Sequence, residues 1–151
     1  RGSIVPFFKE ISKKSKTLPI TDLKMTRFNI SLVDACNLVL KCVESSRGSE
    51  IYVPKIPSFR IVDLAKAINK NCKLKVIGIR PGEKIHEEMI TLNDAPNTLE
   101  HKNHYIILPP DQKKYYMKKI RGYKKVNNNF SYNSMNNKQF LSIQDLKILI
   151  K

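Results

Sequence analysis

Apolar residues recur along the chain at two different spacings, and these spacings predict alternating helices and strands. Spacings of three and four residues predict helices over residues 4–14 and 83–90, and further helices that begin at Ser31, Ser58 and Ser142. Short apolar or alternating runs predict strands over residues 18–20, 25–30, 50–53, 74–79 and 105–108. Because helices and strands alternate throughout, we predict the α/β class, or α+β for the chain taken as an isolated piece.

Two of the predicted helices begin with a capping signal. Ser31 stands three residues before Asp34, and Ser142 stands three residues before Asp145. In each pair the hydroxyl can accept the backbone N–H of the aspartate, while the carboxylate returns to the serine. We therefore expect each helix to begin directly after its serine.

The stretch 111–130 is rich in lysine and asparagine and has no clear apolar period, so we predict a loop or strap there. It separates residues 1–110, which carry the candidate chemistry, from residues 131–151, which we interpret as a C-terminal extension ending in a helix. The predicted organisation is therefore a binding region, a basic strap and an extension.

Length and charge narrow the functional classes. The chain has 151 residues, enough for one ordinary core, and no apolar run near the ~20 residues that span a bilayer, so we expect neither a membrane segment nor a secretory leader. The formal net charge is +15, from 28 Lys and Arg against 13 Asp and Glu. Only six of the 28 are arginines, which read phosphates and bases bidentately, so nucleic-acid binding is disfavoured. A basic binding module for nucleic acid or an acidic partner stays an alternative.

The cysteines indicate the compartment. Cys36, Cys42 and Cys72 are odd in number and lack C-x-x-C spacing, so a disulfide framework and a four-cysteine zinc site are excluded. We expect the first two to be small buried residues on the apolar side of the helix after Ser31. A reducing cytoplasm is the predicted location.

Several other kinds of site are not supported by the spacing of their residues. The glycines have neither G-x-G nor P-loop spacing, so these residues supply no dinucleotide or triphosphate cradle. Tyr115 and Lys119 have the spacing of a hydride-transfer pair, but six tyrosines and 22 lysines give about one such pair by chance. His101 and His104 are spaced like metal ligands without further ligands, and we expect them to be exposed at the start of a strand. His86 lacks the second histidine of a zincin motif.

The most informative stretch is residues 79–89, where a strand ends and a Pro-Gly pair turns the chain. Arg80 at the end of the strand can present a planar guanidinium to a diphosphate. Glu83, one turn later, can accept hydrogen bonds from ribose hydroxyls. The same spacing also permits a plain surface ion pair between Arg80 and Glu83.

Five blocks together carry a family resemblance. Residues 80–89 (RPGEKIHEEM) resemble the substrate-domain motif of extended short-chain dehydrogenase/reductases that act on nucleotide sugars. Residues 1–8 (RGSIVPFF), 18–28 with LPITD and MTRF, 51–65 (IYVPKIPSFRIVDLA), and the end of the chain from Tyr132 to Ser142 resemble the inverting UDP-N-acetylglucosamine 4,6-dehydratases. The similarity spans nearly the whole chain and is weakest over 111–130.

The resemblance implies a function and a division of labour. It implies that the chain is the C-terminal, substrate-binding part of an NADP-dependent lyase, and that the NADP-binding domain and the catalytic residues lie upstream of Arg1. The chain alone would then be inactive. The substrate would be UDP-N-acetylglucosamine, the pathway pseudaminic acid and surface or flagellin glycan synthesis, and the assembly a homo-oligomer, a dimer or hexamer.

By motif position, the resemblance assigns five substrate-binding residues. Arg80 is implied to hold the UDP diphosphate, Glu83 the ribose, and Arg27 a second phosphate contact. Thr17 and Ser3 are weaker candidates near the nucleotide. No catalytic, cofactor-binding or metal-binding residue is expected in this chain. Another nucleotide-sugar epimerase or dehydratase of the same superfamily stays an alternative function.

Overall fold

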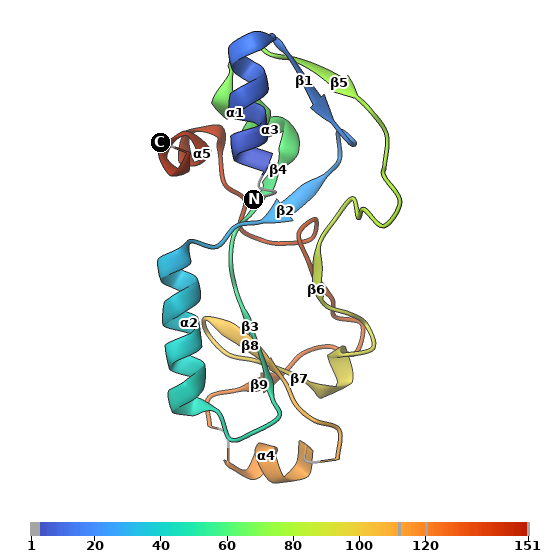
Figure 1. The fold of residues 1–151 in the computed structure, drawn as a ribbon. Helices are drawn as coiled ribbons and strands as arrows, with labels where there is room; N and C mark the ends of the chain where they lie inside the picture. Colours follow the sequence, from blue (N-terminus) through green and yellow to red (C-terminus); the bar gives the residue numbers. More distant parts are fainter. Residues whose placement is uncertain (1–3, 112, 120, 151) are drawn as a thin grey trace. The chain divides into compact units, whose positions relative to one another are not determined.

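The computed structural model describes residues 4–111, 113–119 and 121–150. They form two compact units that are interleaved along the chain (Figure 1). Unit 1 comprises Arg1–Asn29, Pro57–Glu87 and Ser134–Lys151, and unit 2 comprises Ile30–Ile56 and Glu88–Asn133. The predicted segments 1–110, 111–130 and 131–151 follow one another and do not match these units. That residues 1–110 act as one binding region stays a prediction.

Unit 1 contains two small sheets and three helices. Its elements are α1 (Ile4–Lys14), β1 (Thr17–Ile20), β2 (Thr26–Phe28), β4 (Ser58–Arg60), α3 (Ile61–Ile68), β5 (Lys73–Val76) and α5 (Ile143–Leu149). Strand β1 pairs in parallel with β5, and β2 pairs antiparallel with β4. The core side chains come from the three helices, from β1 and β4, and from Met25 just before β2: Phe8, Leu18, Ile20, Met25, Phe59, Ile61, Leu64, Ala65, Ala67 and Leu146.

Alternation along β1 explains how unit 1 gains both a core and a cavity wall. Leu18 and Ile20 are buried, while Thr17 and Pro19 are only partly buried. Side chains of a strand point alternately to its two faces, so β1 sends two apolar side chains into the core. Pro19, on the other face, lines the cavity described below, and the core residue Ile20 borders it as well.

The C-terminal segment is an integral part of unit 1. Ser58 N–H donates to the Gln139 carbonyl, and Leu141 N–H donates to the Ser58 carbonyl, each at 2.8 Å. The capping box of Ser142 and Asp145 then begins α5, as predicted, and Leu146 enters the core. Residues 139–146 are therefore fixed to β4 and the core of unit 1.

Unit 2 is built on a four-stranded antiparallel sheet with the order β3-β8-β7-β9. Its elements are α2 (Leu32–Ser45), β3 (Ile51–Pro54), β6 (Glu88–Ile90), the 3-10 helix η1 (Ala95–Asn97), β7 (Thr98–Glu100), β8 (His104–Ile107), α4 (Lys113–Lys119), β9 (Lys124–Lys125) and β10 (Tyr132–Asn133). Strands β6 and β10 form a separate antiparallel pair. Leu99, Ile106 and Leu108 form the core with Tyr116 of α4.

The predicted α/β class is confirmed, and most predicted elements are present. The predicted helix over 83–90 is wrong, because residues 81–87 form turns and loop and Glu88–Ile90 is strand β6. Loop residues 83–87 instead hydrogen-bond to β2, a tertiary interaction that outweighs their local helical period. The helix expected from Ser58 begins only at Ile61, after β4.

Two further expectations need correction. The stretch 111–130 contains α4 and β9 in addition to loop, because Tyr116 anchors α4 in the core of unit 2. Helix α2 begins after Ser31 as predicted, but it has no buried residue, and Cys36 is exposed. Among the described residues, no helix is both long and apolar enough to cross a membrane.

Candidate functional site

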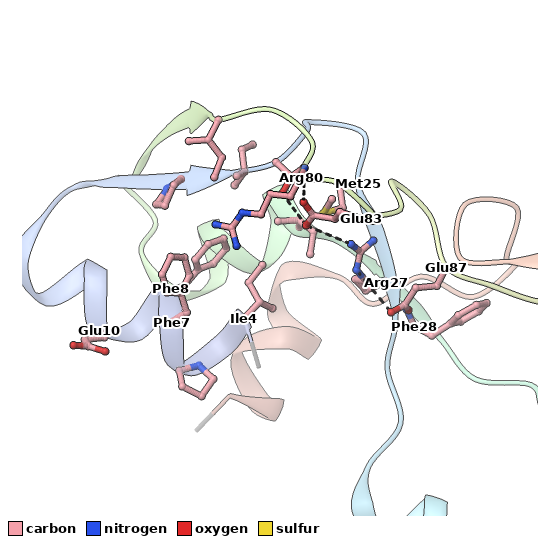
Figure 2. Close-up of a pocket in the computed structure, with 16 residues that line it drawn as sticks. Ile4, Phe7, Phe8, Glu10, Met25, Arg27, Phe28, Arg80, Glu83 and Glu87 are labelled. Atoms are coloured by element: carbon pink, nitrogen blue, oxygen red, sulfur yellow. Dashed lines mark hydrogen bonds and ion pairs between the residues drawn. The ribbon is translucent and has the colours of Figure 1, made fainter. Parts of the chain in front are cut away.

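A cavity of about 730 Å³ lies within unit 1, between α1, β1, β2 and the loop that follows β5 (Figure 2). Its lining divides into an apolar part and a charged part. The apolar part is Ile4, Pro6, Phe7, Phe8, Pro19, Ile20, Met25, Phe28, Ile61 and Ile77, and the polar or charged part is Glu10, Thr21, Arg27, Arg80, Glu83 and Glu87. A mostly apolar cleft with a few convergent polar groups is the usual form of a small-molecule site.

Consecutive phenylalanines of α1 serve two purposes. Phe8 is fully buried in the core, whereas Phe7 is 45% exposed, and their ring centroids lie 6.0 Å apart. Successive helix positions point about 100° apart, so Phe8 holds the helix on the core while Phe7 is the more exposed of the two rings at the cavity. Lys13 and Lys14 close the helix at the end where cations are favoured by the helix dipole.

Arg27 of β2 is held from several sides. Its Nη1 donates to the carbonyls of Thr26, at 2.7 Å, and Ile85, at 2.9 Å. Its Nη2 lies 4.0 Å from Glu83 Oε1, and its Nε lies 3.7 Å from Glu87 Oε1. The guanidinium therefore joins β2 to the loop, and its charge is already balanced by two carboxylates.

Glu83 is equally well fixed. Thr21 Oγ1 donates to Glu83 Oε1 at 3.0 Å, and the backbone N–H of Arg80 donates to Glu83 Oε2 at 3.3 Å. The predicted alternative, an ion pair between the side chains of Arg80 and Glu83, is not what forms: Glu83 pairs with Arg27 instead. The reason is the turn at Gly82 (φ 79°), which brings the carboxylate back to the Arg80 backbone.

Arg80 differs from Arg27 in that it keeps its charge available. Its side chain extends across the cavity toward α1 in Figure 2, and it lines the cavity with Arg27 and Glu83. Among the residues the structure describes, no carboxylate forms an ion pair with its guanidinium. Arg80 is therefore the cationic fork at this site that can still bind an anion.

Of the two weaker candidates, the structure describes only Thr17. Thr17 begins β1 beside Lys73 and is not among the lining residues, and its N–H donates to Ser15 Oγ at 3.0 Å. Ser3 lies outside the described residues. Arg80, Glu83 and Arg27 thus lie together, and Thr17 does not join them.

Sequence reasoning missed Thr21 and Glu87. Glu87 Oε2 accepts the backbone N–H of Phe28 at 2.7 Å, in addition to the ion pair with Arg27. Both residues stand inside quoted motifs, LPITD and RPGEKIHEEM, but their partners are distant in sequence. The predicted helix over 83–90 was a second cause, because a helix there gives no reason for Glu87 to contact β2.

The histidine pair of unit 2 is structural. His104 is buried, at 3% exposure, which corrects the expectation of an exposed residue. Its Nε2 hydrogen-bonds to the Tyr123 hydroxyl at 2.9 Å, and its ring lies 4.8 Å from the His101 ring. Burial, and next the nearby Lys41, lower the His104 pKa to about 4. Within the described ranges, no group of three or more His, Cys, Asp or Glu is arranged to hold a metal ion.

Dinucleotide binding has no counterpart among the described residues. Gly48, Gly78, Gly82 and Gly122 have positive φ and lie in the loops between α2 and β3, between β5 and β6, and between α4 and β9. A dinucleotide cradle needs clustered glycines between a strand and a helix N-terminus. The described residues therefore supply no cradle for NADP.

Comparisons with known proteins agree with this fold. A family model described as "Polysaccharide biosynthesis protein" matches residues 1–109. The inverting UDP-N-acetylglucosamine 4,6-dehydratase of Campylobacter jejuni (strain 81-176) is 48% identical over 99% of this chain and 47% of its own length. The UDP-glucose 4-epimerase of Rickettsia canadensis is 38% identical over 99% of this chain and 45% of its own length.

A solved structure is also similar. The X-ray structure of Pen from Bacillus thuringiensis matches with a TM-score of 0.81 and 28% identity, over 99% of this chain and 45% of that one. The chain thus spans about half the length of the curated relatives it matches. The predicted resemblance to inverting UDP-N-acetylglucosamine 4,6-dehydratases is confirmed.

Proposed function

Because this chain belongs to the family of polysaccharide biosynthesis proteins, we propose that its unit 1 binds the nucleoside diphosphate of a nucleotide sugar. In the full form of the proposal it is the UDP-binding part of a C5-inverting UDP-N-acetylglucosamine 4,6-dehydratase. The observation that carries the proposal is the Arg80 guanidinium, which forms no ion pair with a described carboxylate, at a mostly apolar cavity beside the fixed Glu83 carboxylate.

The charges at the cavity favour Arg80 as the residue that binds the diphosphate. The cavity holds two arginines and three glutamates, so it carries no general positive field of its own. Arg27 is compensated by Glu83 and Glu87, and this leaves Arg80 to donate directed hydrogen bonds to phosphate oxygens. The net charge of +15 supplies only long-range attraction for an anionic ligand.

The remaining groups fit a nucleoside. Phe7 and the aliphatic side chains offer an apolar surface for the base, and Glu83, held by Thr21, offers fixed acceptor oxygens for ribose hydroxyls. Such a site would use the nucleotide as a handle. Binding energy from this non-reacting part would hold the sugar in register with reacting groups supplied elsewhere in the enzyme.

The wider proposal assigns no catalytic step to this chain. The hydride transfers and the removal of water from the sugar would be performed by NADP and residues outside these 151, and the chain alone would be inactive. The product would enter pseudaminic acid and surface-glycan synthesis. The described cysteines are free, as expected for the cytoplasmic location that we propose.

Titration calorimetry with UDP, UMP and uridine tests the binding proposal. We expect UDP to bind more tightly than UMP, and UMP more tightly than uridine, because each phosphate adds charge-assisted hydrogen bonds. Equal affinities for UDP and uridine would show that the cavity does not read the diphosphate.

The Rickettsia relative favours one alternative, a UDP-sugar 4-epimerase. Both named relatives act on UDP-sugars, so binding of UDP does not separate the two. Product analysis of the complete enzyme does, by NMR of the sugar formed from UDP-N-acetylglucosamine. Loss of water with inversion at C5 supports the dehydratase, and a 4-epimer with all oxygens retained supports the epimerase.

A further inference from the structure

A buried chain of hydrogen bonds lies directly behind the charged part of the cavity. Thr26 Oγ1 hydrogen-bonds to Ser134 Oγ at 2.7 Å and to His86 Nδ1 at 2.8 Å. Ser134 is fully buried and Thr26 is 4% exposed. Thr26 belongs to β2, His86 to the loop after β5, and Ser134 to the C-terminal segment, here residues 134–150. All three belong to unit 1.

Each hydroxyl in this hydrogen-bonded series accepts one bond and donates one when the series runs in one direction. The Glu87 N–H donates to Ser134 Oγ at 2.9 Å. If Ser134 then donates to Thr26, and Thr26 donates to His86, the series ends on an unprotonated Nδ1. Hydroxyl chains with one consistent direction strengthen each bond, and a buried hydroxyl without its partner is costly.

Ser134 also forms hydrogen bonds to both backbone polar groups of Glu87. Its backbone N–H donates to the Glu87 carbonyl at 2.8 Å, while its hydroxyl accepts the Glu87 N–H. The C-terminal segment therefore fixes the position of the residue whose carboxylate pairs with Arg27. Two further hydrogen bonds join the same loop to β2. Thr26 N–H donates to the Ile85 carbonyl at 3.1 Å, and the Arg27 side chain donates to that same carbonyl.

Ser134 and His86 do not form a catalytic pair. Ser134 has no exposed surface that a substrate could reach, and its hydroxyl contacts Thr26, which stands between it and His86. Nucleophilic catalysis needs an accessible hydroxyl in direct contact with its base. The chain of hydrogen bonds is therefore a support for neighbouring groups.

We propose that Thr26 and Ser134 are positioning residues for the nucleotide site, with His86 as the terminal acceptor, an inference that rests on the function proposed above. They lock the loop 83–87 onto β2, which sets Glu83, Glu87 and Arg27 in one arrangement. In this way the C-terminal segment, which does not line the cavity, takes part in binding. Small errors in the position of binding groups are costly, so the support has a measurable effect on affinity.

Titration of the full chain with UDP tests this, using variants that differ by one group. Thr26→Val removes the hydroxyl and keeps the shape, and Thr26→Ser keeps the hydroxyl. Thr98→Val is the matched control, since Thr98 is equally buried in unit 2 and its hydroxyl donates to the Asp94 carbonyl at 2.8 Å. Thermal unfolding of each variant gives the accompanying loss of stability.

We expect Thr26→Val to weaken UDP binding about tenfold, the cost of one unsatisfied buried group. Thr26→Ser should restore most of the affinity, and Thr98→Val should leave it unchanged at a similar loss of stability. Ser134→Ala should weaken UDP binding as much as Thr26→Val does. If Thr26→Val does not fold, Ser134→Ala alone tests the positioning role. His86→Asn should keep binding, because the amide oxygen replaces Nδ1 as acceptor, whereas His86→Leu should not.

The two proposals fail in different ways. If the unmodified chain does not bind UDP, the proposed function is wrong. If it binds UDP and both Thr26→Val and Ser134→Ala bind equally well, the positioning role is wrong. Equal weakening by Thr26→Val and Thr98→Val would likewise overturn it, because the effect would then follow stability alone.

Discussion

Thr21 and Glu83 are 62 positions apart in sequence, and a 3.0 Å hydrogen bond from the threonine hydroxyl to the glutamate carboxylate joins them. Thr21 lies directly after β1, and Glu83 lies in the turn after β5. Because β1 and β5 are parallel neighbours, their C-terminal ends meet at one edge, where ligands of such sheets commonly bind. The register of this strand pair thus sets the acid at the mouth of the cavity.

Glu83→Gln should separate the two effects of this carboxylate. The amide keeps an acceptor for Thr21, but it removes a negative charge near the site and a partner of Arg27. We expect pyrophosphate to bind more tightly to the variant, because less anionic repulsion opposes it. UDP should gain less or bind more weakly, because an acceptor for ribose is lost. Calorimetry with both ligands measures this, and equal gains would remove the ribose role.

Arg80→Ala should weaken UDP binding by about 1.5–3 kcal/mol, the range for a hydrogen bond to a charged group. Lys84→Ala is the matched control, because Lys84 is an exposed cation in the same loop that does not line the cavity. It should change the affinity little. The same affinity in both variants would assign the effect to net charge and not to the Arg80 fork.

The stability of unit 2 should fall in acid because of His104. Its pKa is lowered to about 4 by burial and by neighbouring cations, so the unfolded chain binds the proton more readily than the folded one. Stability is unaffected above pH 6.5 and decreases as the pH falls from 6.5 toward 4. We expect a loss on the order of 1–2 kcal/mol, reduced by solvent screening of the exposed lysines.

Urea unfolding at several pH values measures this loss. His104→Gln is the comparison, since its amide can still meet the Tyr123 hydroxyl and does not titrate. The difference in unfolding free energy between the two proteins should shrink in acid. A constant difference from pH 7 to pH 4.5 would contradict the assignment.

Tyr132→Phe should destabilise unit 2 without affecting unit 1 directly. The Tyr132 hydroxyl accepts the Ile56 N–H and donates to the Ile56 carbonyl, both at 3.0 Å. Its loss removes the partner of the N–H and of the carbonyl of Ile56, which are partly buried, and costs about 1–3 kcal/mol. Denaturant unfolding measures it, with the exposed Tyr115 changed to Phe as control. A cost no larger than that of the control would show that the hydrogen bonds between Tyr132 and Ile56 do not stabilise unit 2.

One side of α2 should promote self-association of the isolated chain. Five large apolar side chains of this helix are 60–80% exposed: Leu32, Val33, Val39, Leu40 and Val43. Exposed apolar patches of this kind associate in water. Val39→Lys should therefore reduce the sedimentation-average mass without lowering stability. Asn37→Lys adds the same charge at an exposed polar position and should not. Equal effects would point to charge alone.

Local signals were read correctly where neighbours in sequence decide the structure. The pairs Ser31–Asp34 and Ser142–Asp145 begin α2 and α5 as predicted, because each cap needs only residues three positions apart. The Pro-Gly turn likewise follows from its own dihedral preferences. In the same way, the short motif RPGE contained both Arg80 and Glu83, which line one cavity.

The helical period over 83–90 misled for the opposite reason. Its carbonyl and amide groups found partners on β2 and on Ser134, which no local pattern includes. The apolar face of α2 misled too: its period is correct for a helix, but periodicity does not say whether anything covers the face.

The residue types, the helix caps, the turn and the family of this chain follow from the order of its amino acids. The tertiary structure alone decided which of the two cavity arginines pairs with the described carboxylates, that Thr21 supports Glu83, and that Ser134 meets Thr26 from 108 positions away. The physical reason is range. Propensities and caps act over a few residues, whereas ion pairs and buried hydroxyl chains exist only after distant segments have packed together.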